Sequence, residues 1–278
     1  MDHRKRIPFR SCRISLRSKD KMTSFGLRNQ RGSCWVNATL QAVFRIPDVQ
    51  ARYVPDAVIP QGSTIDLCLQ EIWGSKGDEG LKAFYECVHT AVMPAGEGIG
   101  DSHELLEYLC DKLPFLDKLC RFKSVNVVKC DNCDYKDSRP ESLIEFSVSP
   151  TQRKQSLADC VIQSVTPAKI PDWKCEKCTG KGCTKQLLMA SFPQVFVFHA
   201  TSLRTSVSYS TVLVLNGQKY ALLAVVCFNG GHWWTYGREM PPGKNWIEYD
   251  DSTLRNHGPN HFPLSDHMRL LFYYRINE

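Results

Sequence analysis

Residues 25–35 read FGLRNQRGSCW, a glycine-punctuated loop that runs directly into a helical segment. The helical pattern covers residues 37–44, where apolar and polar side chains follow helical spacing, and it stops before Pro47. Cys34 is therefore expected at or near a helix N-terminus. The partly positive backbone N–H groups at such a position stabilise a thiolate, so the sequence predicts a lowered pKa for the Cys34 thiol.

The chain after this helix divides into a helical part and a β-rich part. A second helix is expected over residues 102–113, with Asp101 or Ser102 as its N-cap and a stripe of leucines on one face. From about residue 121 the apolar runs become short and β-like, at 124–128, 142–148, 195–199, 207–215, 220–228 and 270–274. Asn216-Gly217 indicates a hairpin between two of these runs. Helices first and strands after predict an α+β fold.

Composition excludes several classes of protein. The 278 residues are 42% hydrophobic and 23% charged, which is typical of a compact globular protein, either one large domain with an inserted lobe or two domains. The longest apolar stretch, 220–228, is too short to span a bilayer, and no secretory leader is seen. The 13 cysteines are odd in number and dispersed, which favours a reducing, intracellular setting in the cytoplasm or nucleus.

Residues 1–24 form a basic segment that is expected to be a flexible tail. Its lysines and arginines account for the whole net charge of +6, so the remainder of the chain is close to neutral. A solvated tail, a nuclear address, a nucleic-acid patch and an organelle-targeting segment all fit this composition. No feature of the sequence separates these alternatives.

Two CxxC pairs have the spacing of metal knuckles. They are Cys130/Cys133 and Cys175/Cys178, separated by residues 134–174, so a hairpin or small lobe must bring them together. Four sulfur ligands leave no open coordination position, so the pattern predicts one structural Zn²⁺ ion and no metal in catalysis. Cys183 is an alternative ligand, or else a small buried hydrophobic residue.

A histidine and a pair of aspartates complete a possible thiol-based site. His232 follows Gly230-Gly231 at the end of a strongly apolar strand, where it is expected beside open space. Residues 245–251 (NWIEYDD) alternate as a short strand that ends in two carboxylates, one of which is able to accept the ring N–H of His232. Taken alone, His232 has the alternative interpretation of a structural histidine, and the two aspartates have that of a turn. Cys, His and Asp in this order favour a cysteine peptidase.

These segments resemble the signature boxes of the ubiquitin-specific protease family, the papain-like cysteine deubiquitinases. The resemblance extends from about Phe25 to the end of the chain. Residues 26–41 resemble the cysteine box, residues 231–251 the histidine box, and residues 100–106 (GDSHELL) the acidic helix between them. The second CxxC pair, followed by TKQ at 184–186 and FPQV at 192–195, stands in the family's order.

The resemblance implies a papain-like fold with a helical thumb at about 25–120, zinc-bearing β fingers at 121–185 and a β palm at 186–278. It implies a thiol protease that hydrolyses the isopeptide or peptide bond after the C-terminal glycine of ubiquitin or polyubiquitin. The enzyme is expected to be a monomer without membrane or nucleic-acid partners. The implied catalytic residues are Cys34 as nucleophile, His232 as base, Asp250 as orienting residue, Asn29 as oxyanion donor and Asp251 as an auxiliary group. Asp101 and Glu104 are implied to bind the ubiquitin tail, with helix capping as the alternative role.

The chain also departs from the family pattern. Arg31-Gly32-Ser33 stands where Gly-Asn-Thr is usual, Ala38 replaces a serine, Gly100 replaces a glutamine, and a basic motif is missing after His199. A catalytically weak ubiquitin-binding protein and a peptidase for another ubiquitin-like modifier therefore remain alternatives. A nucleic-acid binder is the least supported, because basic and aromatic residues do not interleave outside the tail.

Overall fold

The computed structural model describes residues 24–54, 57–59, 63–77, 79–93, 98–151, 154–201, 206–238, 245–259, 261–263 and 266–276. The basic segment predicted as a tail lies outside these residues except for Ser24. In the part of the chain that is described, no helix combines the length and the apolar character needed to cross a membrane.

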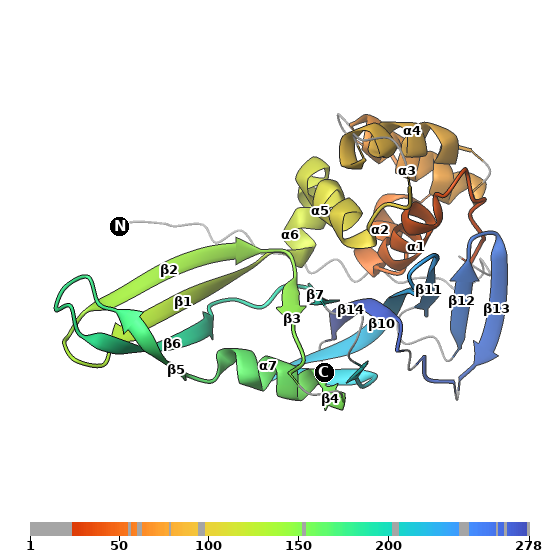
Figure 1. The fold of residues 1–278 in the computed structure, drawn as a ribbon. Coiled ribbons are helices and arrows are strands. Elements are labelled where there is room, and N and C mark those ends of the chain that lie inside the picture. Colours follow the sequence, from red (N-terminus) through yellow and green to blue (C-terminus); the bar gives the residue numbers. More distant parts are fainter. Residues whose placement is uncertain are drawn as a thin grey trace, which may run out of the picture.

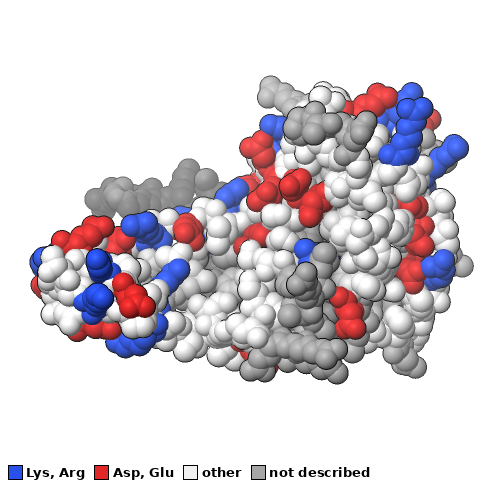
Figure 2. Space-filling model, viewed as in Figure 1, with Lys and Arg blue, Asp and Glu red and all other residues white. Residues whose placement is uncertain are grey.

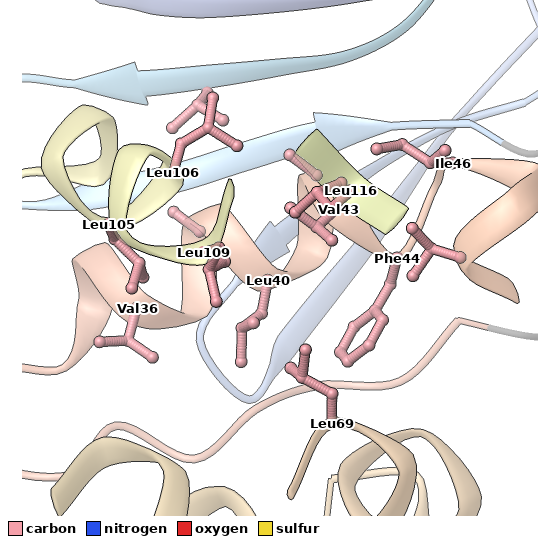
Figure 3. Close-up of a cluster of buried hydrophobic side chains, with 14 of the residues drawn as sticks. Val36, Leu40, Val43, Phe44, Ile46, Leu69, Leu105, Leu106, Leu109 and Leu116 are labelled. Carbon is pink, nitrogen blue, oxygen red and sulfur yellow. The ribbon is translucent and has the colours of Figure 1, made fainter. Parts of the chain in front are cut away.

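Helices α1 to α6 gather at one end of the molecule, above the end of the larger sheet (Figure 1). Their bounds are α1 Cys34–Val43, α2 Pro47–Arg52, α3 Thr64–Ser75, α4 Leu81–Val92, α5 Ser102–Lys112 and α6 Pro114–Cys120. Every residue of α1 is buried, so this helix lies at the centre of the group. Figure 3 shows its apolar side chains facing leucines of α3, α5 and α6. The nucleophile candidate thus stands at the start of a rigidly packed helix.

A four-stranded antiparallel sheet extends away from the helices (Figure 1). Its strands are β1 Phe122–Cys130, β2 Lys136–Leu143, β5 Ala168–Lys174 and β6 Lys181–Met189, in the order β2-β1-β6-β5. The CxxC pairs lie at the tip: Cys130 ends β1, and Cys175 follows β5. Helix α7, Leu157–Val165, interrupts the β-rich half and begins with a capping box formed by Ser156 and Asp159.

The larger sheet has eight strands and carries the segments around His232 and Asp250. Its order is β13-β12-β11-β10-β14-β7-β3, with β9 also paired to β10. The bounds are β3 Phe146–Val148, β7 Val195–Ala200, β9 Val212–Leu215, β10 Gln218–Phe228, β11 Trp233–Gly237, β12 Trp246–Asp250, β13 Thr253–Gly258 and β14 Met268–Ile276. A short pair, β4 Lys154–Ser156 and β8 Ser206–Ser208, forms a third sheet.

The predicted α+β fold is confirmed, with helices before most strands. The hairpin at Asn216-Gly217 is confirmed as well: both residues have positive φ, 47° and 76°, and β9 pairs with β10 across them. Two predicted strands were wrong in extent. The run 142–148 splits into the end of β2 and β3 because the chain passes between sheets there, and the run 207–215 splits into β8 and β9.

Candidate active site

Cys34 is the first residue of α1, as the sequence predicts, with Ser33 at the N-cap. The thiol is nearly inaccessible, since Cys34 is 2% exposed. Burial raises its pKa, and the backbone N–H groups of Trp233, Trp35 and Cys34 itself only partly oppose this effect. The predicted lowering of the Cys34 pKa is therefore wrong for this state of the protein, because loss of hydration outweighs the helix N-terminus.

His232 and Asp250 meet across two neighbouring strands. His232 immediately precedes β11, Asp250 is the last residue of β12, and the two strands pair antiparallel. The Nε2 atom of His232 lies 2.7 Å from Oδ1 of Asp250. Asn229 fixes the turn before β11, because its Oδ1 accepts hydrogen bonds from the backbone N–H groups of Gly231 and His232. Nδ1 is then the histidine nitrogen that remains for contact with a thiol.

The histidine loop is held against the start of α1. The Trp233 N–H lies near enough to the Cys34 thiol to affect its pKa. Thr235, in β11, donates a buried hydrogen bond of 2.7 Å to the carbonyl of Ala38 in α1. These contacts hold β11, the strand that follows His232, against the helix that begins at Cys34.

Asn29 organises the loop before Cys34. Its Oδ1 accepts hydrogen bonds of 3.1 Å from the N–H groups of both Gly32 and Ser33. Its Nδ2 donates to Oδ2 of Asp251 at 2.8 Å. The amide is therefore held at both ends, which fixes its direction beside the helix N-terminus.

Asp251 joins the two halves of the site, although it directly follows the partner of His232. Its Oδ1 accepts a hydrogen bond of 2.7 Å from Asn37 Nδ2, and its carbonyl accepts one of 2.9 Å from the Leu27 N–H. Asp251 has φ of 51°, a conformation that aims its carboxylate back at the cysteine loop. The two adjacent aspartates thus have different partners.

The four cysteines predicted as zinc ligands gather at the tip of the smaller sheet. Their sulfur atoms all lie within 4.8 Å of one another; they belong to Cys130, Cys133, Cys175 and Cys178. The Asn132 N–H donates to Cys130 Sγ at 3.3 Å and lowers the pKa of this thiol to about 7. Such a group of thiols fits a tetrahedral ion of the zinc type. Cys183 is buried opposite Cys130 in the β1–β6 pair and is not part of the group.

The sequence profile of ubiquitin carboxyl-terminal hydrolases matches residues 25–273 of this chain. The chain belongs to the ubiquitin carboxyl-terminal hydrolase family. This confirms the family indicated by the resemblance of the cysteine and histidine boxes.

One curated relative is ubiquitin C-terminal hydrolase 13 of Arabidopsis thaliana. It is 26% identical to this chain in an alignment of 159 positions that covers 47% of this chain and 13% of that protein. This chain therefore matches only a small part of the length of that relative.

Solved structures show the same fold. A chain of the SAGA DUB module Ubp8/Sgf11/Sus1/Sgf73 bound to monoubiquitin superposes with a TM-score of 0.77 at 15% identity, covering 95% of this chain and 73% of that chain. The module bound to ubiquitin aldehyde gives a TM-score of 0.75 at 15% identity, with coverage of 92% and 70%. The similarity establishes the ubiquitin carboxyl-terminal hydrolase fold for this chain.

The acidic helix of this hydrolase family member lies directly beside the candidate nucleophile. Ser102 donates to the Trp35 carbonyl at 3.1 Å, and Trp35 follows Cys34. Asp101 is the N-cap of α5 and accepts a hydrogen bond of 2.7 Å from the His103 N–H, so its capping role is present. Glu104 is exposed in the first turn of the same helix. The start of α5, which carries both carboxylates, thus packs against the residue that follows Cys34.

The departure at residues 31–33 is accommodated at a cost in backbone energy. Arg31 has φ of 53° and Gly32 has φ of 89°, so the loop needs two left-handed residues in succession. Glycine adopts this conformation without strain, whereas a non-glycine residue such as Arg31 has a cost of about 1 kcal/mol. The loop nevertheless forms the two hydrogen bonds to Asn29 described above.

The sequence did not assign a site role to Asn37. This side chain donates to both the Leu27 carbonyl, at 3.1 Å, and the Asp251 carboxylate. The sequence pattern could have indicated this role, because an amide side chain in a fully buried helix requires hydrogen-bond partners from other segments. The identity of those partners depends on tertiary packing.

Proposed function

We propose that this chain is a cysteine-dependent deubiquitinase that hydrolyses the isopeptide or peptide bond after the C-terminal glycine of ubiquitin. The observation that carries this proposal is the 2.7 Å contact between His232 Nε2 and Asp250 Oδ1 beside the buried Cys34. The contact fixes one tautomer and leaves Nδ1 to serve the thiol. This is the arrangement that thiol-based acyl transfer requires.

In the proposed reaction His232 takes the proton of Cys34, and the thiolate attacks the glycine carbonyl. The resulting oxyanion accepts hydrogen bonds from the Cys34 N–H and from the second Nδ2 hydrogen of Asn29, since the first is engaged by Asp251. The tetrahedral intermediate collapses to a thioester as His232 gives its proton to the leaving lysine amine. His232 then removes a proton from water, which attacks the thioester and releases ubiquitin and the free thiol.

The substrate side of the proposal places the ubiquitin tail along α5. Asp101 and Glu104 carry negative charge at the start of α5, and this charge suits a basic peptide segment. We propose the division into thumb, fingers and palm at about 25–120, 121–185 and 186–278, with one structural Zn²⁺ held by the four cysteines. The ion would fix the tip of the smaller sheet and would take no part in the chemistry. A reducing, intracellular setting suits a reaction that depends on free thiols.

The deciding experiment is the reaction with ubiquitin that carries an electrophile at its C-terminus. We expect one covalent adduct with the wild type, none with Cys34→Ala, and an unchanged adduct with Cys87→Ala, a half-buried cysteine in α4. Absence of the wild-type adduct, or an adduct that survives Cys34→Ala, would contradict the proposal. Parallel probes ending in the tails of other ubiquitin-like modifiers test the alternative substrate class.

A second candidate function is ubiquitin binding with slow turnover. It is favoured by the burial of Cys34, which raises the thiol pKa, and by the left-handed Arg31 in the oxyanion loop. This candidate predicts a measurable dissociation constant for ubiquitin together with a slow probe reaction that Arg31→Gly accelerates. A fast reaction that is insensitive to Arg31→Gly would exclude it.

A further inference from the structure

Three side chains from separate elements converge in a group of their own, separate from the four cysteines and from the group of His232, Asp250 and Asp251. His103 lies on α5, Glu145 lies in the link between β2 and β3, and His199 lies on β7. Their ligand atoms all lie within 4.8 Å of one another. The side chains are only 20%, 11% and 15% exposed, respectively. No role in the proposed reaction accounts for this cluster, which we call the His-Glu-His cluster.

The two imidazole rings present nitrogen atoms to the same carboxylate. They stack with centroids 4.1 Å apart at an interplanar angle of 21°. His199 Nδ1 lies 3.2 Å from Glu145 Oε1, and His103 Nε2 lies 2.8 Å from Glu145 Oε2. Both histidines therefore converge on Glu145 from one side.

The contact between His103 and Glu145 is close without being a hydrogen bond. Among the described residues, the buried atoms His103 Nε2 and Glu145 Oε2 form no hydrogen bond, although they face each other at an ion-pair distance of 2.8 Å. An ion pair requires a protonated His103, whereas an unprotonated Nε2 leaves two buried polar atoms without a bond, at a desolvation cost of about 1–3 kcal/mol each. A cation that both atoms coordinate removes this cost.

The distances suit the ligands of one ion. Ligand atoms about 2.0–2.1 Å from a tetrahedral ion lie roughly 3.3 Å from each other. The contacts of 2.8 and 3.2 Å in the cluster need to open by only a few tenths of an ångström to reach that separation. Glu107 supplies a fourth ligand one turn along α5, with Oε1 3.8 Å from His103 Nε2 and a side chain that is 57% exposed and free to rotate.

The surroundings favour a cation and give it an entry path. Acidic side chains gather over α5 on the face shown in Figure 2, and this helix carries Glu104, Glu107 and Asp111. A groove of about 450 Å³ is lined by Glu107, Glu145 and other residues of α5 and the smaller sheet. Glu145 of the cluster and the neighbouring Glu107 thus border a groove whose lining has four carboxylates, those of Glu107, Asp111, Glu141 and Glu145, and one guanidinium, that of Arg121.

We propose that His103, Glu145 and His199, with Glu107, bind one divalent transition-metal ion, Zn²⁺ by the chemistry of the donors. Imidazole nitrogen and carboxylate oxygen are ligands that suit zinc, whereas sites for magnesium or calcium are built from oxygen alone. The ion links α5 to the eight-stranded sheet. It would hold the helix that Asp101 caps, and this site is distinct from the cysteine cluster in both position and ligand type.

Cobalt(II) is the probe that distinguishes the two sites. Protein loaded with one equivalent of zinc at the cysteines is titrated with Co²⁺ and followed by visible absorption. We expect one further equivalent with weak d–d bands and without the intense sulfur-to-cobalt charge-transfer band of a cysteine site. His199→Gln and Glu145→Gln are each expected to weaken this binding by at least about 10- to 100-fold, and Glu107→Gln by about tenfold.

Matched control variants test where the ion binds. His89→Gln removes a histidine at the end of α4 and is expected to leave cobalt binding unchanged. His232, Asp250 and Asp251 also have ligand atoms that lie close together, and His232→Gln tests whether the ion binds there. This variant is expected to leave cobalt binding unchanged. Retention of the first zinc equivalent reports that each variant is folded.

The proposal is overturned by any of three results. Wild-type protein that binds no second equivalent shows that the cluster is a metal-free ion-pair network. Cobalt binding that persists in both His199→Gln and Glu145→Gln shows that the ion lies elsewhere, as does binding that only His232→Gln removes. If one cluster variant fails to retain the first zinc, the exposed Glu107→Gln substitution and the wild-type titration still decide the outcome.

Discussion

The side-chain amide of Asn29 donates a 2.8 Å hydrogen bond to the Asp251 carboxylate, although the two residues are far apart in the chain. The same carboxylate accepts a bond from Asn37 in the buried helix α1. Asp251 therefore acts as a bridge between the cysteine segment and the end of β12, and it positions the proposed oxyanion donor.

Asn29→Ala is expected to lower kcat for a ubiquitin C-terminal substrate by about 100- to 1000-fold with little change in KM, since an oxyanion donor acts in the transition state. Asp251→Asn leaves one acceptor oxygen for two amides and is expected to lower kcat by about tenfold. The double variant should be no slower than Asn29→Ala, because both changes act through one amide. Additive losses in kcat would show that Asp251 does not act through Asn29.

Burial raises the pKa of the Cys34 thiol, so the protein without substrate should hold mostly the protonated thiol at neutral pH. The alkylation rate of Cys34 by iodoacetamide is expected to increase with pH and to be still increasing above about pH 8.5, the usual thiol pKa. Mass spectrometry of the peptide that contains Cys34 measures this rate apart from the other cysteines. A plateau below neutral pH would instead reveal a preformed thiolate–imidazolium pair.

Removal of the proposed structural zinc should destabilise the protein. Cys178→Ser is expected to abolish retention of the tightly bound ion after dialysis and to lower stability by about 2 kcal/mol, roughly 4–8 °C in Tm. Cys183→Ser is the matched control, because Cys183 lies outside the cluster of four sulfur atoms. Zinc content and thermal unfolding measure both effects. Equal zinc content in Cys178→Ser and the wild type would contradict the assigned ligand set.

Gly26 lies where the cysteine segment crosses the loop after Asp251. A Cβ atom at this position would lie 2.5 Å from the Ser252 carbonyl oxygen, which is backbone and has little freedom to move. Gly26→Ala is therefore expected to destabilise the protein by about 1–3 kcal/mol and to lower kcat, because the crossing holds Leu27 against Asp251.

Gly74→Ala provides the comparison for this effect in denaturant unfolding. Gly74 is within α3, and a Cβ there would meet no atom within 4 Å. This substitution should increase stability by about 0.5–1 kcal/mol, since alanine loses less conformational entropy in a helix. Equal effects of the two substitutions on stability would show that the close approach at Gly26 has no energetic consequence.

Local features were predictable from residue order alone. Glycines before Cys34 and the periodicity after it placed a helix start there, and Asp101 was predicted as a possible cap for α5. Asn216-Gly217 predicted a hairpin because few residue pairs adopt two positive φ angles. These interactions involve neighbours in the chain, so short sequence patterns contain the information that decides them.

The ionisation of Cys34 was not predictable in this way. The sequence shows a helix N-terminus, which lowers a thiol pKa, but it does not show how completely other segments cover the sulfur atom. The split of residues 142–148 between two sheets has a similar origin. A run of suitable residues indicates strand character, whereas the change of partner from β1 to β7 depends on the whole topology.

The sequence by itself determined the family, the α+β class, the two cysteine knuckles and the short segments that contain Cys34, His232 and the two aspartates. Only the tertiary structure decided that Asp250 faces His232 while Asp251 faces Asn29 and Asn37. It alone also brought His103 and His199 to Glu145. The physical reason is that strand register and helix packing set the direction of each side chain across long sequence separations, and neighbouring residues in the chain carry no record of those contacts.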